Sequence, residues 1–140
     1  MADGLTFVDT HVLAYAHDRS EAGKQPIAAA LLAGLWESRS GTLSTQVLQE
    51  FYVVATRKFR PALSSADARE VVALYGTWPT VVVDLSLILA ATEIEESDSL
   101  SFWDAMIVEA ARRSGADTLV SEDLQDGRLI AGVRIRNPFA

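Results

Sequence analysis

The sequence predicts an α/β fold in which a mostly parallel sheet carries helices on both of its faces. Short apolar runs rich in β-forming residues alternate along the chain with longer segments whose apolar residues recur at helical spacing. This order is typical of strand–helix–strand units, whose strands are parallel. The first junction, within residues 5–15, passes from a strand into a helix at Asp9. A carboxylate is therefore expected where ligands bind in open parallel sheets, outside the carboxyl ends of the strands.

The elements of the first half follow from apolar patterns and from the residues at their ends. Pro26 suits the first turn of a helix, Pro61 stops another, and Ser64 with Asp67 can form a capping box. Ser44 or Thr45 can cap the helix that follows the second strand. The expected elements are a strand at 5–8, a helix from 10, a polar loop at 18–23, a helix at 26–38, a strand at 42–44, and helices at 46–58 and 65–75.

The second half continues the alternation. A run of β-branched residues predicts a strand at 80–84, and Gly115 is placed to end a helix. The remaining elements follow from the same patterns. They are a helix at 85–94, a polar turn at 95–99, a helix at 102–114, a strand at 116–121, a turn at 124–127 and a last short strand at 130–135.

Composition limits the classes of function. The chain of 140 residues has the size of one domain, and 49% hydrophobic with 22% charged residues is typical of a globular protein. The net charge is 12 − 19 = −7, which argues against broad non-specific binding of nucleic acid but suits a site for cations. The absence of cysteine excludes disulfides, thiolate zinc sites and cysteine nucleophiles, and favours a cytoplasmic location. The longest apolar run, 27–36, is too short to span a membrane, and Asp3 argues against a signal peptide.

Four acids fall at equivalent places in the expected fold. Asp9 ends the first strand, Glu50 lies in the helix after the second, Asp104 is near the start of a later helix, and Asp123 follows the strand that ends at Val120. In a parallel sheet these places share one edge. Carboxylates at contact distance repel each other unless a cation lies between them, and hard oxygen ligands favour Mg²⁺ or Mn²⁺.

Each acid also has a purely structural interpretation. Asp9 or Thr10 can be a helix N-cap, and Asp104 can complete a capping box with Ser101. Glu50 can be a solvated helix residue, and Glu122 with Asp123 can favour a helix N-terminus. The argument for a shared site therefore depends on all four acids having the same placement.

Four motifs in this order resemble those of PIN-domain nucleases. The segment FVDTHVLAY (7–15) resembles the opening motif of that family, and STQVLQEF (44–51) its second acidic motif. The segment LSFWDAMI (100–107) resembles the third. The segment LVSEDLQDG (119–127), with the ending IRNPF (135–139), resembles a VapC-like subgroup of bacterial PIN toxins. The resemblance covers essentially the whole chain, and the joint occurrence is more specific than any single motif.

The resemblance implies a single PIN-like domain over residues 1–140. Its fold would be a three-layer α/β/α sandwich with a central, mostly parallel sheet of four to five strands. The implied function is that of a Mg²⁺- or Mn²⁺-dependent endoribonuclease, with Asp9, Glu50, Asp104 and Asp123 as metal-binding catalytic carboxylates. The implied partners are an RNA substrate, a VapB-type antitoxin and a second copy of the chain.

Two departures from the family pattern matter for the site. His11 stands where asparagine is usual, and we do not expect it to be a metal ligand. The fourth motif offers three acids: Asp123 matches best, Asp126 is a possible second contributor, and Glu122 is the weakest. Ser121 precedes the fourth acid and can orient a water or a carboxylate, or cap the next turn.

The residues that bind RNA cannot be assigned from the sequence. Cationic candidates lie at helix C-termini and in the loop after the first helix, although cations at helix ends also have a structural explanation. Trp36, Trp78 and Trp103 are expected in the core or an interface. The cationic candidates are Arg57, Lys58, Arg60, Arg112, Arg113, Arg19 and Lys24.

Two other functions compete with a toxin ribonuclease. A PIN-domain RNA-processing nuclease would share the chemistry, and a non-catalytic binding module would share only the fold. A third, phosphotransfer through an aspartyl intermediate, is disfavoured. Such phosphatases need an acid two residues after the first, where this chain has His11, and Asp9-Thr10 lacks the acidic pair of receiver domains.

Overall fold

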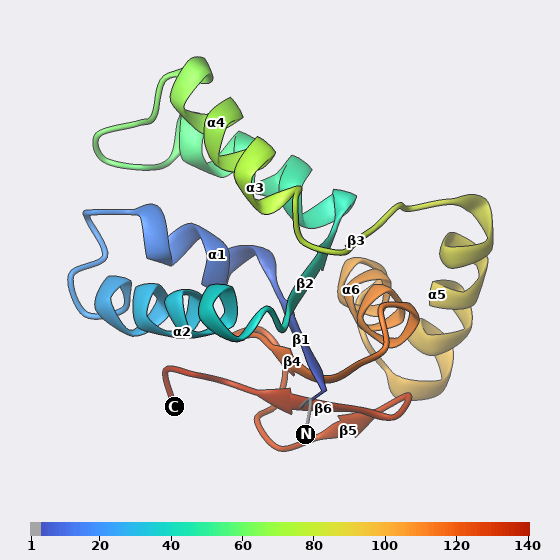
Figure 1. Ribbon diagram of the computed structural model, residues 1–140. Coiled ribbons are helices and arrows are strands. Elements are labelled where there is room, and N and C mark those ends of the chain that lie inside the picture. Colours follow the sequence, from blue (N-terminus) through green and yellow to red (C-terminus); the bar gives the residue numbers. More distant parts are fainter. Residues whose placement is uncertain (1–3) are drawn as a thin grey trace.

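A computed structural model describes residues 4–140 and shows one sheet with helices on both sides (Figure 1). The strands are β1 (Leu5–Val8), β2 (Gly41–Ser44), β3 (Thr80–Val81), β4 (Ala116–Val120), β5 (Leu129–Ile130) and β6 (Val133–Arg136). The helices are α1 (Thr10–His17), α2 (Gln25–Ser38), α3 (Thr45–Arg57), α4 (Ser65–Tyr75), α5 (Leu85–Asp98) and α6 (Phe102–Arg113).

The sheet is mostly parallel, as the alternation of strands and helices predicted. Its order is β3-β2-β1-β4-β6-β5, and the β5–β6 pair is the antiparallel one. Strand β1 is central, because Phe7 pairs with Thr42 of β2 and with Leu119 of β4. In Figure 1, α1 and α2 lie on one side of the sheet and α5 and α6 on the other. The three-layer α/β/α arrangement is therefore confirmed.

Within residues 4–140 the sheet has six strands, which corrects the expectation of four to five. The difference lies in the segment expected to be one strand at 130–135, which instead forms the β5–β6 hairpin. The turn between these strands is made by Ala131 and Gly132, both of which have positive φ values of 51° and 81°. Two-residue hairpin turns of this kind are usually marked by asparagine, aspartate or glycine at the first position. Alanine at 131 gives no such signal, so the sequence pattern did not reveal the turn.

The boundaries around α5 also differ from expectation. Strand β3 ends at Val81, not at residue 84, because Asp84 caps α5 by accepting a hydrogen bond from Leu87 N at 2.8 Å. The polar segment 95–99 is not a turn: α5 continues through it to Asp98. Glutamates are good helix formers, and neither glycine nor proline interrupts the segment. Ser99, in the left-handed conformation with φ 56°, ends the helix.

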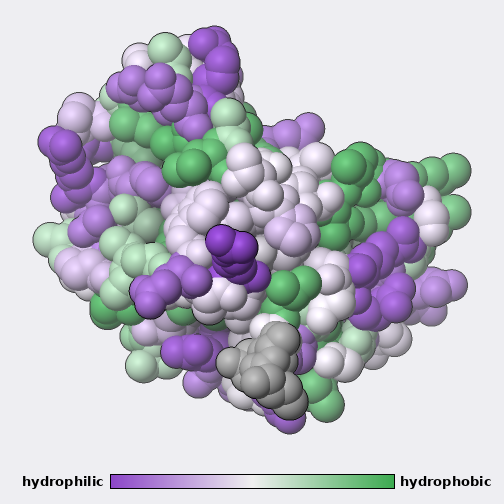
Figure 2. Space-filling model, viewed as in Figure 1, coloured by the Kyte–Doolittle hydropathy of each residue, from purple (hydrophilic) through white to green (hydrophobic). Residues whose placement is uncertain are grey.

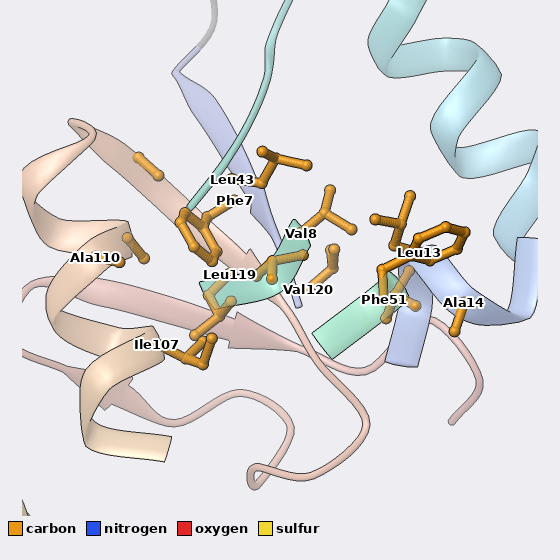
Figure 3. Close-up of a cluster of buried hydrophobic side chains, with 14 of the residues drawn as sticks. Phe7, Val8, Leu13, Ala14, Leu43, Phe51, Ile107, Ala110, Leu119 and Val120 are labelled. Carbon is orange, nitrogen blue, oxygen red and sulfur yellow. The ribbon is translucent and has the colours of Figure 1, made fainter. Parts of the chain in front are cut away.

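The central strands contribute a core to each face of the sheet (Figure 3). On one side Phe7 and Leu119 lie against Ile107 of α6, and on the other Val8 lies toward Phe51 of α3. These side chains have at most 3% of their surface exposed. Burial of each large apolar side chain stabilises the fold by roughly 1.5–3 kcal/mol. This packing places the ends of β1, β2 and β4 at one edge of the sheet, where the candidate site lies.

Among residues 4–140, no helix has both the length and the apolar content needed to cross a bilayer.

Candidate functional site

Asp9 directly follows β1 and is the most buried of the four predicted acids, with 5% of its surface exposed. Its Oδ1 accepts a hydrogen bond from Thr10 N at 2.7 Å, so Asp9 does cap α1. Its Oδ2 accepts a second hydrogen bond from the Ser121 hydroxyl at 2.7 Å. Burial raises the pKa of Asp9 to about 6, with a smaller contribution from the charge of Asp123. The two hydrogen bonds and the nearby His11 act in the opposite direction.

Glu50 reaches the same edge of the sheet from α3. This helix begins after β2, where the Ser44 hydroxyl accepts a hydrogen bond from Val47 N at 3.3 Å. Glu50 is half-buried, and its Oε1 accepts a hydrogen bond from the Thr10 hydroxyl at 2.6 Å. Its Oε2 accepts one from Gln46 Nε2 at 3.4 Å. The interpretation of Glu50 as a freely solvated helix residue is therefore wrong.

Asp104 lies in the first turn of α6, which runs back antiparallel to β4 and so begins at this edge. The helix is capped by Ser101, whose hydroxyl accepts a hydrogen bond from Asp104 N at 3.1 Å. Burial raises the pKa of Asp104, and the charges of Asp123 and Glu50 raise it further. The Ser101 hydrogen bond and His11 lower it. The carboxylates of Asp123 and Glu50 are thus close enough to Asp104 to disfavour its ionised form.

Asp123 is the acid of the fourth motif that faces the others. Ser121 ends β4 and accepts a hydrogen bond from Asp123 N at 3.1 Å, which turns the chain. His11 Nδ1 lies 3.0 Å from Asp123 Oδ2, and both side chains are partly exposed. Ser121 therefore fills both roles expected of it, because it caps this turn and also holds Asp9.

The other two acids of that motif have different partners. Glu122 accepts a hydrogen bond from the Tyr15 hydroxyl at 2.6 Å and forms an ion pair with Lys24. These interactions lower the pKa of Glu122 against the opposing effect of its burial. Asp126 accepts a hydrogen bond from Asn137 N at 2.8 Å. Glu122 is thus bound to α1 and to the residue before α2, and Asp126 is bound to the C-terminal segment. Neither acid lines the cavity described next.

All four predicted acids line one cavity of about 200 Å³. Besides the acids, its walls include the two neighbours of Asp9 on α1, an amide of α3 and apolar side chains of α3 and α6. These residues are Thr10, His11, Gln46, Val54, Trp103 and Ile107. The cavity thus combines hard oxygen donors with a partly apolar wall.

The donor set suits Mg²⁺ or Mn²⁺, which prefer carboxylate and neutral oxygen ligands. Gln46, which lines the cavity, has a buried amide oxygen, Oε1, without a hydrogen-bond partner within residues 4–140. Within the same residues, no three acidic or histidine side chains are arranged to hold one ion together. Their oxygens are instead held by Thr10, Ser121 and His11.

The cationic candidates for RNA binding divide into two groups. Arg112 and Arg113 both donate hydrogen bonds to the buried Glu109, at distances of 2.6–2.8 Å, and Lys24 is paired with Glu122. Arg57, Lys58, Arg60 and Arg19 are exposed. Arg112, Arg113 and Lys24 thus form ion pairs within the fold.

The three tryptophans were expected in the core or an interface, and for Trp103 the structure excludes the core alone. Trp78 is buried and Trp36 packs against it, with ring centroids 5.0 Å apart. Trp103, in contrast, is 61% exposed and lies at the cavity.

Gln46 is a site residue that sequence reasoning missed, and the hydroxyl of Thr10 is another. The sequence indicates Thr10 only as a possible cap, whereas its hydroxyl donates a hydrogen bond to Glu50. Gln46 precedes Glu50 by four residues, which places both on one face of α3. This spacing was the available signal for Gln46.

Comparison with known proteins supports the family assignment. The chain is similar in fold to the crystal structure of VapC20 from Mycobacterium tuberculosis, described as a sarcin-ricin loop cleaving toxin. The TM-score is 0.64, with 23% identity over 84% of this chain and 89% of that chain. It is also similar to VapBC2 from Rickettsia felis bound to a DNA fragment from its promoter, with a TM-score of 0.64. The identity there is 16% over 95% of this chain and 98% of that chain.

No curated protein sequence matches the chain. The family model for the PIN domain matches residues 6–126, which include all four acids. The match covers most of the chain and agrees with the motifs and with the topology. The chain therefore belongs to the PIN domain family.

Proposed function

We propose that this protein is a divalent-metal-dependent endoribonuclease and the toxin of a VapBC-type toxin–antitoxin pair. The observation that carries the proposal is the convergence of Asp9, Glu50, Asp104 and Asp123, from four separate segments, on one cavity. Like charges gathered in this way destabilise one another, and a bound cation removes that repulsion. Membership of the PIN domain family supports the same chemistry.

In this proposal the four carboxylates hold Mg²⁺ or Mn²⁺. When bound, the cation activates a water molecule and neutralises charge on the phosphodiester. The chain's own residues orient the carboxylates. Ser121 and the backbone of Thr10 hold Asp9, while the Thr10 hydroxyl holds Glu50. Expected products carry 5′-phosphate and 3′-hydroxyl ends.

The substrate and the antitoxin partner are inferred from the similar structures. VapC20 is described as cleaving the sarcin-ricin loop, which supports RNA as the substrate class here. The Rickettsia felis structure contains VapBC2, which supports a VapB-type antitoxin as a partner. We further propose that the domain spans residues 1–140 and acts in the cytoplasm.

A homodimer is proposed from the apolar surface as well as from the resemblance. Val82, Leu85 and Leu89 are 57–69% exposed, although they are large and apolar. Figure 2 shows apolar surface on the side of the molecule where Figure 1 places α5. Exposed apolar patches commonly mark protein–protein contacts.

The test is cleavage of a structured RNA by the purified protein with Mg²⁺, with Mn²⁺ and with EDTA, beside Asp9→Asn and Asp104→Asn. We expect cleavage only with metal and its loss in both variants, with circular dichroism showing that both still fold. Asp67→Asn, an exposed acid in the first turn of α4, is the matched control and should cleave normally. Equal cleavage by Asp9→Asn would end the assignment of Asp9 as a catalytic residue, and no cleavage by the wild type with either metal would leave the non-catalytic binding module.

A second experiment separates a toxin from an RNA-processing nuclease. Induced expression of the chain in bacteria should arrest growth, and co-expression of the product of a neighbouring small gene should restore it. Unimpaired growth with an active nuclease would favour the processing enzyme.

A further inference from the structure

Gln46 is the one residue in residues 4–140 that combines deep burial, a position at the acid cavity and a side-chain oxygen without a partner. It lies in the first turn of α3, and 6% of its surface is exposed. Buried amide oxygens normally accept a hydrogen bond, and an exception calls for an explanation. The cavity beside Gln46 is the place from which a donor can come.

The orientation of the amide follows from its neighbour. Gln46 Nε2 donates to Glu50 Oε2 at 3.4 Å, while the other oxygen of Glu50 is held by Thr10 at 2.6 Å. A flipped amide would bring Gln46 Oε1 against the Glu50 carboxylate, and two acceptors repel each other. The NH₂ group is therefore directed to Glu50, and the oxygen is left for another ligand.

The chemistry of that ligand is limited by the cavity. An unpaired acceptor attracts a donor, and the four surrounding carboxylates attract positive charge. No lysine or arginine lines the cavity within the described residues. A hydrated divalent cation supplies both features, because Mg²⁺ and Mn²⁺ retain water molecules that donate hydrogen bonds.

We propose that Gln46 is a positioning residue for the hydrated cation, with its amide oxygen as the neutral acceptor of the site. This inference rests on the proposed metal-dependent function and assigns to that site a residue outside its four acids. The two polar groups of the Gln46 side chain have different roles. Its nitrogen orients Glu50, and its oxygen binds the hydration shell, so that α3 presents a charged and a neutral oxygen on one face.

The test is Mn²⁺ binding to the full chain by isothermal titration calorimetry, beside the metal-induced rise in melting temperature. Gln46→Met keeps the length of the side chain but removes both polar groups. We expect it to bind Mn²⁺ about 10–100-fold more weakly than the wild type, the range found when groups around metal ligands are removed. Without metal, its melting temperature should not fall, because the unpaired oxygen is gone.

Gln49→Met is the matched control, because Gln49 is exposed on the same helix and does not line the acid cavity. It should bind Mn²⁺ like the wild type. Gln46→Glu tests the acceptor separately from the donor, since a carboxylate keeps an oxygen at this place but loses the NH₂ group that donates to Glu50. We expect it to bind Mn²⁺ more tightly than Gln46→Met, and Gln46→Leu takes the place of Gln46→Met if that variant does not fold.

The outcomes separate this inference from the function on which it rests. Wild-type protein that binds no Mn²⁺ would overturn both the metal site and the role of Gln46. Normal Mn²⁺ binding by Gln46→Met, or equal weakening in Gln46→Met and Gln49→Met, would overturn the role of Gln46 alone. Binding by Gln46→Glu that is no tighter than binding by the apolar variant would do the same.

Discussion

The Ser121 hydroxyl donates a hydrogen bond to Asp9 Oδ2 across 2.7 Å and thereby joins the carboxyl end of β4 to that of β1. The two residues are 112 positions apart in the chain, and both are buried. The same hydroxyl accepts a hydrogen bond from Asp123 N. Ser121 thus fixes the relative positions of the first and the last acid of the site.

This relationship predicts the effect of Ser121→Ala on pH dependence. The hydrogen bond lowers the pKa of Asp9, so its removal should raise that pKa above its present value of about 6. A hydrogen bond of about 1 kcal/mol corresponds to a shift of roughly 0.5–1 pH unit. The titration of the Asp9 carboxyl group in the metal-free protein, followed by ¹³C NMR in EDTA, should move upward by this amount, whereas Ser121→Thr should retain the wild-type titration. An unmoved titration in Ser121→Ala would show that the Ser121 hydroxyl does not stabilise the ionised form of Asp9.

Replacement of Asp9 should stabilise the metal-free protein. The pKa of Asp9 is raised from 3.8 to about 6, so between these pH values the folded protein binds a proton that the unfolded chain has lost. Stability therefore falls as pH rises through this window, and the cost persists above it. At pH 7.5 in EDTA, Asp9→Asn should raise the free energy of unfolding by up to about 3 kcal/mol. The Ser121 hydroxyl can turn to accept from the new amide.

Urea denaturation of wild type and Asp9→Asn, from pH 4 to pH 8, measures this effect. The gap between the two proteins should be small near pH 4 and widen up to pH 7. A constant gap across the range would mean that the ionisation of Asp9 does not limit the stability of the metal-free fold.

Thr10→Val should impair catalysis without disturbing α1. The substitution removes the hydroxyl that donates to Glu50 at 2.6 Å but keeps the shape of the side chain and the backbone N–H that binds Asp9. Loss of a group that orients a metal-binding carboxylate typically costs about 10–100-fold in activity. Steady-state cleavage of RNA with saturating Mg²⁺ measures the loss. Thr92→Val, on the exposed face of α5, is the control and should leave the rate unchanged.

The hydrogen bond between Tyr15 and Glu122 should contribute to stability and not to catalysis. Tyr15→Phe removes the hydroxyl that donates to Glu122 at 2.6 Å and keeps the edge-to-face contact with Phe139 at 5.3 Å between centroids. A hydrogen bond to a charged acceptor contributes about 1.5–3 kcal/mol. We expect a melting temperature lower by several degrees in differential scanning calorimetry, with kcat retained. A large fall in kcat with an unchanged melting temperature would instead place Glu122 in the catalytic site.

The parts of the fold that were predictable are those in which local patterns and end residues agree. The strand before Asp9 and the helix capped by Ser101 are examples, because each combines an apolar pattern with a suitable cap. The end of α5 was not predictable, since Glu95 and Glu96 suit a polar turn as well as an exposed helix. The β5–β6 turn was missed because Ala131 adopts a positive φ that its side chain does not favour.

The order of the elements predicts that the acids of the candidate site lie at one edge of the sheet. It does not predict which side chains contact each acid. Parallel topology brings Asp9, Glu50 and Asp104 to one edge, and this much follows from the order of the elements. The choice among Glu122, Asp123 and Asp126 depends on their partners, which come from distant parts of the chain: Tyr15, His11 and Asn137, respectively. Contacts between distant parts of the chain cannot be predicted from the local pattern of apolar and polar residues.

The central position of β1 has a consequence for the protein during its synthesis. Asp9 is synthesised before β4 and Asp123, which follow it by more than a hundred residues. Until then β1 has β2 on one side and nothing on the other, and the acid cavity lacks one of its walls. A nascent chain therefore cannot close the acid cavity before β4 and the segment that carries Asp123 have been synthesised.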